Sequence, residues 1–271
     1  MNKKRILIIT QEMKPYLILS EIAKIANSLP VHLQEQGMEI RVLMPKFGSI
    51  NERRHRLHEV VRLSGINIII DNDDYPLIIK VASLPGARLQ VYFLDNEDFF
   101  KRKDVFADAS NKFYEDNAER MIFFCKGAIE TIKKFGWPPD IIHCHGWMTS
   151  LIPLYIKTVY KKEPVFSHTK VIYSVYENTF KENLAKSFLK KALINKDIKD
   201  SDFEYFKKSN NTGLLMGGIS HADAVIIGSE KIDASIKKHL KNGIKKPVLD
   251  YVEEEKQIPV YLDFYQTLLK K

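Results

Sequence analysis

Short apolar runs alternate along the chain with longer stretches of helical periodicity. Residues 5–10 (RILIIT) form an apolar run between charged residues, which predicts a buried strand. Residues 20–36 carry apolar side chains at helical spacing, and residues 40–44 form a second apolar run. We expect Pro30 to kink or divide the intervening helix and Gly37 to end it. This strand–helix–strand order is the unit from which parallel sheets are built.

Three runs rich in β-branched and aromatic residues follow. They span residues 66–70, 77–82 and 89–94, and turn-forming residues separate them at 71–74 (DNDD) and 85–86 (PG). Such spacing is typical of a meander or of hairpins. We therefore expect a β-rich extension of the sheet.

The second half of the chain returns to alternating strands and helices. The clearest helical pattern spans residues 117–135, and Gly136 with the two prolines after Trp137 stops it. The remaining patterns predict strands at 140–144, 171–175 and 224–227, and helical segments at 147–160, 182–194, 233–240 and 260–269. We predict an α/β fold, a doubly wound and mostly parallel Rossmann-like sheet with a β-rich insertion, over residues 1–245. Residues 246–271 form a tail whose amphipathic helix is expected to pack back on the domain.

Charge and composition indicate which kinds of partner and which cellular compartment fit this chain. The net charge of +8 favours anionic partners, but the lysines are scattered, and the densest region, 181–208, is also rich in acidic residues. No basic motif with interleaved aromatic residues indicates nucleic-acid binding, and no apolar run approaches the roughly 20 residues of a membrane span. Cys125 and Cys144 lie among apolar residues, as buried thiols do in a reducing compartment. We expect a cytoplasmic protein that binds neither nucleic acid nor membranes.

Several segments in fixed order carry a resemblance to a known family. They read PKFG at 45–48, VYFLDN at 91–96, DNAERMIFF at 116–124, GWPPDIIHCH at 136–145 and GGISHADAV at 217–225, with Ser229 after them. The ordered set resembles the N-terminal domain of bacterial glycogen synthases and starch synthases.

The resemblance implies a fold and a reaction. Such enzymes have two Rossmann-like domains that face each other across a cleft, and they transfer glucose from ADP-glucose or UDP-glucose to an α-1,4-glucan such as glycogen. No metal and no other cofactor is implied. The C-terminal domain holds the nucleotide, and the N-terminal domain contributes the acceptor surface and some catalytic contacts. Only 42 residues follow Ser229, so we expect a short single-domain form, with a separately encoded partner domain as one route to activity.

The loop after the first strand departs from the family pattern. The family has Lys-Thr-Gly-Gly there, and this chain has Ile18, Leu19, Ser20 and Glu21. Backbone amides at a helix start favour anions, but Glu21 places a carboxylate where a diphosphate would approach. Two unit charges about 4 Å apart repel by about 4 kcal/mol at an effective dielectric constant of about 20. The donor motif is therefore expected to bind nucleotide sugars poorly.

Two further loops depart from the pattern in the same way. In the family motif His-x-His-Asp-Trp-His the aspartate and the last histidine face the sugar, and here they are Gly146 and Met148. Met148 has no useful hydrogen-bonding group, so the catalytic residues are not assigned. The following strand ends with Tyr176 and Glu177 where the family has histidine and asparagine.

Three functions follow from this combination of retained scaffold and altered loops. The chain is a glycogen or starch synthase family protein that performs glucosyl transfer, a noncatalytic glucan-binding or regulatory subunit of glycogen metabolism, or a subunit that docks another protein through the exposed cleft. For the glucan-binding alternative, Arg120 either contacts sugar or pairs in the scaffold with Glu119 or Asp116. The candidate sugar-binding residues are Tyr114, Asp116, Asn117, Arg120, His145, Trp147, Tyr176 and Glu177.

Overall fold

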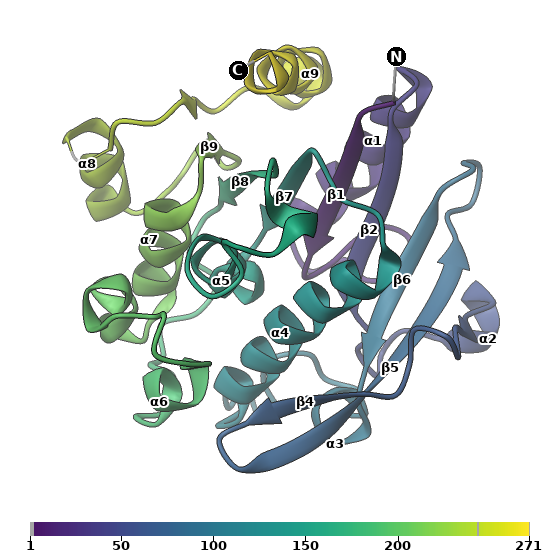
Figure 1. Cartoon of the computed structure of the whole chain (residues 1–271), viewed down its shortest axis with the longest axis vertical. Coiled ribbons are helices and arrows are strands. Elements are labelled where there is room, and N and C mark those ends of the chain that lie inside the picture. The colour runs from purple at the N-terminus through teal and green to yellow at the C-terminus, as the bar shows by residue number, and fades with distance from the viewer. Residues whose placement is uncertain (1–2, 243, 271) are drawn as a thin grey trace.

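A ten-stranded mixed sheet forms the centre of the molecule (Figure 1). The computed structural model describes residues 3–242 and 244–270. In those residues the strand order is β10-β9-β8-β7-β1-β2-β6-β5-β3, and β4 pairs with β5. The strands are β1 (Arg5–Thr10), β2 (Glu39–Pro45), β3 (His58–Glu59), β4 (Ile66–Ile70), β5 (Asp73–Ser83), β6 (Gln90–Asp95), β7 (Ile141–His145), β8 (Lys170–Val175), β9 (Ala224–Ile227) and β10 (Val248–Leu249).

The first strand is the centre of the parallel part of the sheet. β1 pairs in parallel with β2 on one side and with β7 on the other, so that Ile8 lies opposite both Val42 and His143. Residues 6–9 are completely inaccessible to solvent. A parallel strand covered on both faces needs such an uninterrupted apolar run, which explains why the sequence pattern located β1 correctly.

The β-rich extension is confirmed as a set of antiparallel pairs. β6 continues the parallel sheet beside β2, and β5 then pairs antiparallel with β6, β3 and β4. The strand β5 begins at Asp73, earlier than expected, so the turn between β4 and β5 is restricted to Asp71 and Asn72. Asp71 adopts a positive φ of 56°, which the tight connection requires.

Helices cover both faces of the sheet, which makes it doubly wound. α4, α5 and α7 lie in front of the strands in Figure 1, and the opposite face carries α1 and α9. The helices are α1 (Ile22–Glu35), α2 (Glu52–His55), α3 (Glu97–Phe100), α4 (Asn117–Phe135), α5 (Leu151–Lys157), α6 (Phe188–Ala192), α7 (Asn211–His221), α8 (Ala234–Asn242) and α9 (Glu254–Leu269), with 3-10 turns at Trp147–Thr149, Pro164–Phe166, Asp200–Phe203 and Phe206–Lys208.

Several expected boundaries are wrong. Pro30 does not divide α1, which runs without a break to Glu35 and ends before Gly37 as expected. Pro30 itself is buried, so packing of this face offsets the hydrogen bond that proline cannot donate. The expected helix at 182–194 is reduced to α6, and the residues before it pair with a distant segment instead: Asn183 forms a bridge with Asn210, and the Leu184 amide donates to the Ser209 carbonyl at 2.7 Å.

Other differences concern elements that the sequence pattern obscured. The segment at 147–160 divides into a 3-10 turn and α5. The glycine-rich helix α7 and the short strand β10 were not expected, and α9 begins at Glu254 instead of residue 260.

Residues 246–270 lie against the rest of the chain. β10 continues the parallel sheet beside β9. Before it, the Lys246 ammonium group donates to the carbonyl oxygens of Ile219, Ser220 and Ala222, at 2.8, 2.9 and 2.6 Å. Carbonyls at the end of α7 have no partner within the helix, and a cation is a favourable partner for them. α9 then packs against α1.

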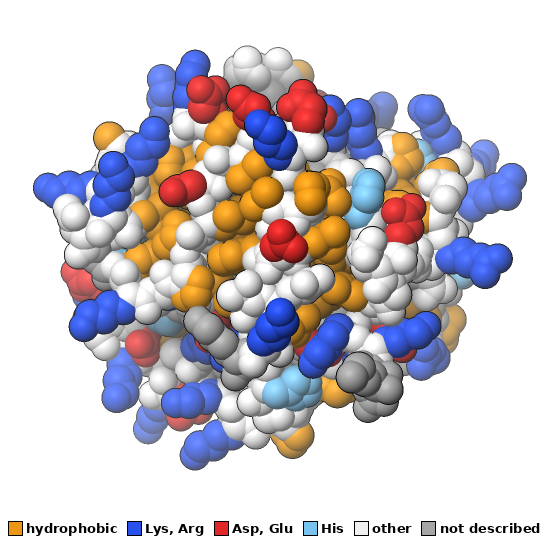
Figure 2. All heavy atoms as spheres, turned by 90° about the horizontal axis from the view of Figure 1, so that it is seen from above, with side chains coloured by type: hydrophobic (Ala, Val, Ile, Leu, Met, Phe, Trp, Pro, Cys, Tyr) orange, Lys and Arg blue, Asp and Glu red, His pale blue; other side chains and the backbone are white. Residues whose placement is uncertain are grey.

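The surface distributes its charges widely. Figure 2 views the molecule from above Figure 1 and shows Lys and Arg side chains spread around the periphery of that face, with acidic groups between them and apolar side chains nearer its centre. Among the described residues, no helix has both the length and the apolar character that crossing a membrane requires.

The contact of Lys246 with three carbonyl groups yields a stability prediction. Replacing Lys246 with methionine leaves these carbonyls without their donor, and we expect the free energy of unfolding to fall by about 1–3 kcal/mol. Urea denaturation followed by circular dichroism measures this change. The matched control is Lys245→Met, because Lys245 is exposed; equal effects of the two substitutions would contradict the assignment.

Candidate functional site

Four loops meet at the carboxyl edge of the parallel strands. They follow β1, β7, β8 and β9, which are neighbours in the sheet and run in the same direction. In doubly wound folds, ligands bind beyond this edge. The Ser229 hydroxyl links three of the loops, because it accepts the Glu177 amide at 2.9 Å and donates to the Glu21 carboxylate. Glu21 and the Tyr176–Glu177 pair therefore lie together.

A buried carboxylate occupies the amides of the loop after β1. Glu12 is inaccessible to solvent, and its Oε2 accepts the Leu19 amide at 2.6 Å and the Ser20 amide at 2.7 Å. Its Oε1 accepts the Ser20 hydroxyl at 2.7 Å. These amides lie in the loop just before α1, where an anionic ligand could use them, and here the chain supplies its own anion.

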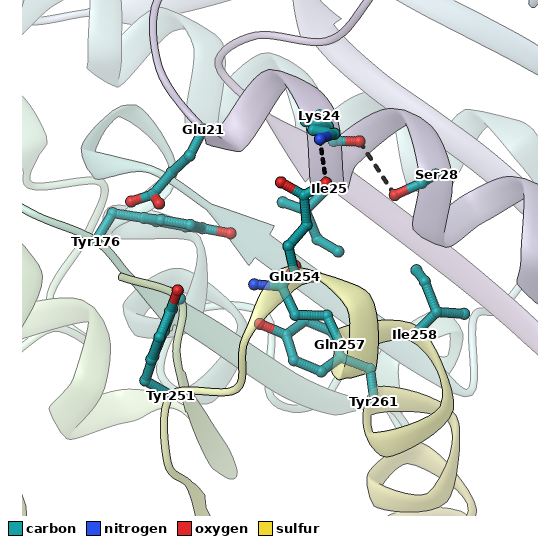
Figure 3. Close-up of a pocket in the computed structure, with 11 residues that line it drawn as sticks. Glu21, Lys24, Ile25, Ser28, Tyr176, Tyr251, Glu254, Gln257, Ile258 and Tyr261 are labelled. Atoms are coloured by element: carbon teal, nitrogen blue, oxygen red, sulfur yellow. Dashed lines mark hydrogen bonds and ion pairs between the residues drawn. The ribbon is translucent and has the colours of Figure 1, made fainter. Parts of the chain in front are cut away.

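The other side chains at positions 18–21 are largely open to solvent. Ile18 and Leu19 are 59% and 45% exposed, although both are large apolar residues. Glu21 is also exposed, and Figure 3 shows its carboxylate above the ring of Tyr176. The loop therefore presents two apolar side chains and a carboxylate, and no cation, at the four positions.

Gly146 lies in a conformation that an aspartate would adopt only with strain. Its φ is +84°, and a Cβ atom there would lie 2.2 Å from Oε1 of Gln11. Gln11 is buried, and this same oxygen accepts the Met148 amide at 3.5 Å. Met148 is fully buried and its carbonyl accepts the Cys125 thiol at 3.0 Å. Gln11 thus fills the space into which a side chain at 146 would project.

Two buried histidines lie beneath the loops on the face that α9 covers. His143 Nε2 is 2.6 Å from the Ser174 hydroxyl, and His143 Nδ1 is hydrogen-bonded to the Tyr265 hydroxyl of α9. His145 Nδ1 is 2.7 Å from the Tyr176 hydroxyl. Burial lowers the pKa of His143, as does the neighbouring His145, and burial lowers the pKa of His145 to about 3. Both rings are therefore neutral at physiological pH.

The residues at 114–120 form a separate assembly with Trp147. Arg120 is inaccessible and donates to the carbonyls of Phe99 (2.8 Å) and Val105 (2.6 Å) and to the side chain of Asn117. Burial lowers its pKa to about 10. It makes no ion pair with Asp116 or Glu119, so the expected scaffold pairing is wrong, although the contacts of Arg120 lie within the scaffold.

The other members of this assembly are also held internally. Asp116 pairs with Arg102, whose guanidinium carbon lies 4.4 Å from the centre of the Tyr114 ring. The side-chain amide of Asn117 donates to the Phe106 carbonyl at 2.7 Å. The centre of the Phe106 ring lies 5.0 Å from the centre of the Trp147 ring. The candidate sugar-binding residues therefore divide into two groups, one around residues 105–106 and one around His145, Tyr176 and Glu177.

Two residues that shape these loops were not predicted from the sequence. Glu12 and Gln11 are polar residues directly after an apolar strand, which was the available signal. Both side chains are buried under the loop that follows them, and this burial has no local sequence pattern. The tail tyrosine Tyr265 was also missed as a partner of His143, because no local pattern relates residues that are 122 positions apart.

Comparison with known proteins identifies the scaffold. A family model described as the starch synthase catalytic domain matches residues 5–247. This chain belongs to the starch synthase catalytic domain family. It is 37% identical over 220 residues to a glycogen synthase of Chlorobium limicola, and 38% identical over 229 residues to one of Chlorobaculum tepidum. These matches cover 81% and 84% of this chain but 44% and 46% of the relatives, so the chain spans about half their length.

A solved structure of the family has the same fold. The catalytic domain of starch synthase IV from Arabidopsis thaliana, bound to ADP and acarbose, superposes with a TM-score of 0.70 at 17% identity. The match covers 98% of this chain and 50% of that one. At this level of identity the similarity concerns the fold of this starch synthase family member and not its loops.

Restoring the family aspartate is expected to destabilise this domain. Gly146→Asp forces a side chain into positive φ and against Gln11, and we expect a loss of about 1–3 kcal/mol in the free energy of unfolding. Chemical denaturation measures this loss. In the double variant Gln11→Ala/Gly146→Asp the steric conflict is removed, so part of the stability should return. A single variant as stable as the native chain would show that Gln11 does not exclude the aspartate.

Because His143 and His145 are buried in the neutral form, we expect the free energy of unfolding to fall in mild acid. Between the unfolded pKa of about 6.5 and the lower folded pKa, the unfolded chain binds protons that the folded chain does not. The free energy of unfolding should therefore fall as the pH is lowered from 6.5 towards 4, by about 1.4 kcal/mol per pH unit for each such proton. His145→Gln should reduce this slope by about one proton, whereas His168→Gln, at an exposed position, should leave it unchanged. Denaturation curves recorded across this pH range would test both variants.

Proposed function

We propose that this domain acts in glycogen metabolism as an α-glucan-binding module whose first loop does not hold a nucleotide-sugar donor. The observation that carries the proposal is the Glu12 carboxylate on the amides of Leu19 and Ser20. A diphosphate would have to displace this carboxylate, which would then be left buried without its donors. The exposed carboxylate of Glu21 adds repulsion at the same place.

The positions expected to act on the sugar support the same conclusion. Met148 is buried and offers no side-chain hydrogen bond, and Gly146 has no side chain. The hydroxyl–carboxylate contacts of these loops, Ser20 with Glu12 and Ser229 with Glu21, join one loop to another. The domain is therefore proposed to bind without transferring glucose through this edge of the sheet.

An aromatic hollow near Trp147 is the proposed glucan contact. The rings of Phe113 and Phe180 stack with centres 4.8 Å apart, and Phe180 also packs 5.0 Å from Trp147. A cavity of about 340 Å³ lies beside this stack, with Asn111, Thr179 and Glu182 among its lining residues (Phe106, Ala107, Asn111, Phe113, Thr179, Phe180, Lys181 and Glu182). Apolar ring faces next to hydrogen-bonding groups suit a sugar chain.

Glucosyl transfer is the second candidate function. It is favoured by the family match over residues 5–247 and by the starch synthase relative, whose structure was solved with ADP and acarbose. In this alternative a separately encoded domain supplies the donor site, from ADP-glucose or UDP-glucose. The two candidates differ in whether labelled glucose is incorporated into glycogen when such a domain is present.

Retardation in native gels that contain glycogen tests the proposal. We expect the chain to be retarded and Phe180→Ala to weaken the retardation about tenfold, whereas Phe135→Ala, which removes a ring that packs on Tyr92, leaves it unchanged. Calorimetry should show no binding of ADP-glucose or UDP-glucose. Unchanged mobility, or transfer of labelled glucose by this chain alone, would overturn the proposal.

A further inference from the structure

A second cavity lies where the tail meets the rest of the domain. It has a volume of about 260 Å³ and lies between α1 and α9, next to the loops that follow β8 and β9 (Figure 3). Its walls are formed by Glu21, Lys24, Ile25, Ser28, Tyr176, Gly228, Tyr251, Glu254, Gln257, Ile258 and Tyr261. The last five residues belong to the tail and lie beyond the segment that the family model matches.

Hydrogen-bonding groups converge inside this cavity. Figure 3 shows the hydroxyl groups of Tyr251 and Tyr261 and the side-chain amide of Gln257 directed toward the same space. The Gln257 amide nitrogen also donates to the Val252 carbonyl at 3.1 Å, and the Tyr176 hydroxyl is bound to His145. Tyr261 is 1% exposed and is one of the residues that line the cavity. A phenol hydroxyl that faces a cavity takes its hydrogen-bond partner from water or from a ligand. Burial raises the pKa of Tyr261, so the hydroxyl keeps its proton and both donates and accepts.

The charges of the cavity restrict the class of ligand. Lys24 forms an ion pair with Glu254 across the gap between α1 and α9, so these two charges compensate each other. Glu21 remains as the uncompensated charge among the lining residues, where it accepts the Ser229 hydroxyl. A negatively charged wall repels phosphate and diphosphate groups. Phenol and amide groups match a ligand whose own groups are hydroxyls.

The size of the cavity restricts the ligand further. Pockets for drug-sized molecules begin at about 300 Å³, so a cavity of about 260 Å³ is suited to a smaller molecule. The apolar parts of Ile25, Ile258 and the tyrosine rings can contact the carbon atoms of such a ring.

We propose that this cavity binds a neutral, polyhydroxylated molecule of the size of a single sugar ring, held by Tyr251, Tyr261, Gln257 and Glu21. The site is separate from the aromatic hollow at Phe180 and does not depend on the proposed glucan binding there. Because the tail supplies about half of the wall, a bound ligand also holds α9 on α1. Ligand binding and docking of the tail are therefore thermodynamically coupled.

Calorimetry and thermal unfolding of the full chain with D-glucose, D-galactose, myo-inositol and inorganic phosphate test this site. We expect at least one of the three neutral compounds to bind and to raise the melting temperature with concentration, and phosphate to do neither. Tyr251→Phe removes one hydroxyl from a residue that is 36% exposed, and should weaken binding about tenfold while the chain still folds.

A pair of glutamines in α9 provides the control. Gln257→Ala should weaken binding of the small molecule, whereas Gln266→Ala, on the exposed side of the same helix, should not. Phe180→Ala should leave this binding unchanged while weakening retardation by glycogen, so that each site can fail independently. The proposal is overturned if none of the neutral compounds binds, or if Tyr251→Phe and Gln257→Ala bind as tightly as the native chain.

Discussion

The carboxylate of Glu12 is the interaction on which the edge of the sheet depends. The loop between β1 and α1 contains backbone amides that belong to neither element, and these groups must be satisfied. In this chain Glu12 satisfies the amides of Leu19 and Ser20 from inside the loop. These hydrogen bonds stabilise the loop when no ligand is bound. The side chains at 18–21 are therefore not needed to bind an anion that would satisfy these amides. Exposed Ile18 and Leu19 are consistent with that freedom.

Helix α9 of the tail covers the face of the sheet from which the side chains of His143 and His145 project. Histidines at alternate positions of β7 project from the same face, and without a cover they would be exposed to solvent. α9 places Tyr261 and Tyr265 over this face, where both are buried, and Tyr265 reaches His143. Lys246 fixes the start of the tail on the end of α7, so the path of the chain is set before the helix begins. The altered loops and the tail therefore form one continuous surface.

The sequence predicted the scaffold well and the site incompletely, for a physical reason. Strands β1, β7 and β8 and helix α4 were located because burial on both faces, or strong periodicity, leaves a local pattern. The helix expected at 182–194 failed because its backbone pairs with residues that are distant in the sequence. The substitutions at Gly146 and Met148 were visible, but the reason that Gly146 is a glycine was not. That reason is the side chain of Gln11, which a different strand brings to it.

The two cysteines give the fold an internal reporter. Cys125 on α4 and Cys144 on β7 are both fully buried between the sheet and its helices, and burial raises the pKa of both thiols. Reagents that alkylate thiols need a thiolate that they can reach. Alkylation of either sulfur therefore requires α4 to separate from the sheet. The alkylation rate of the intact chain measures how often this separation occurs.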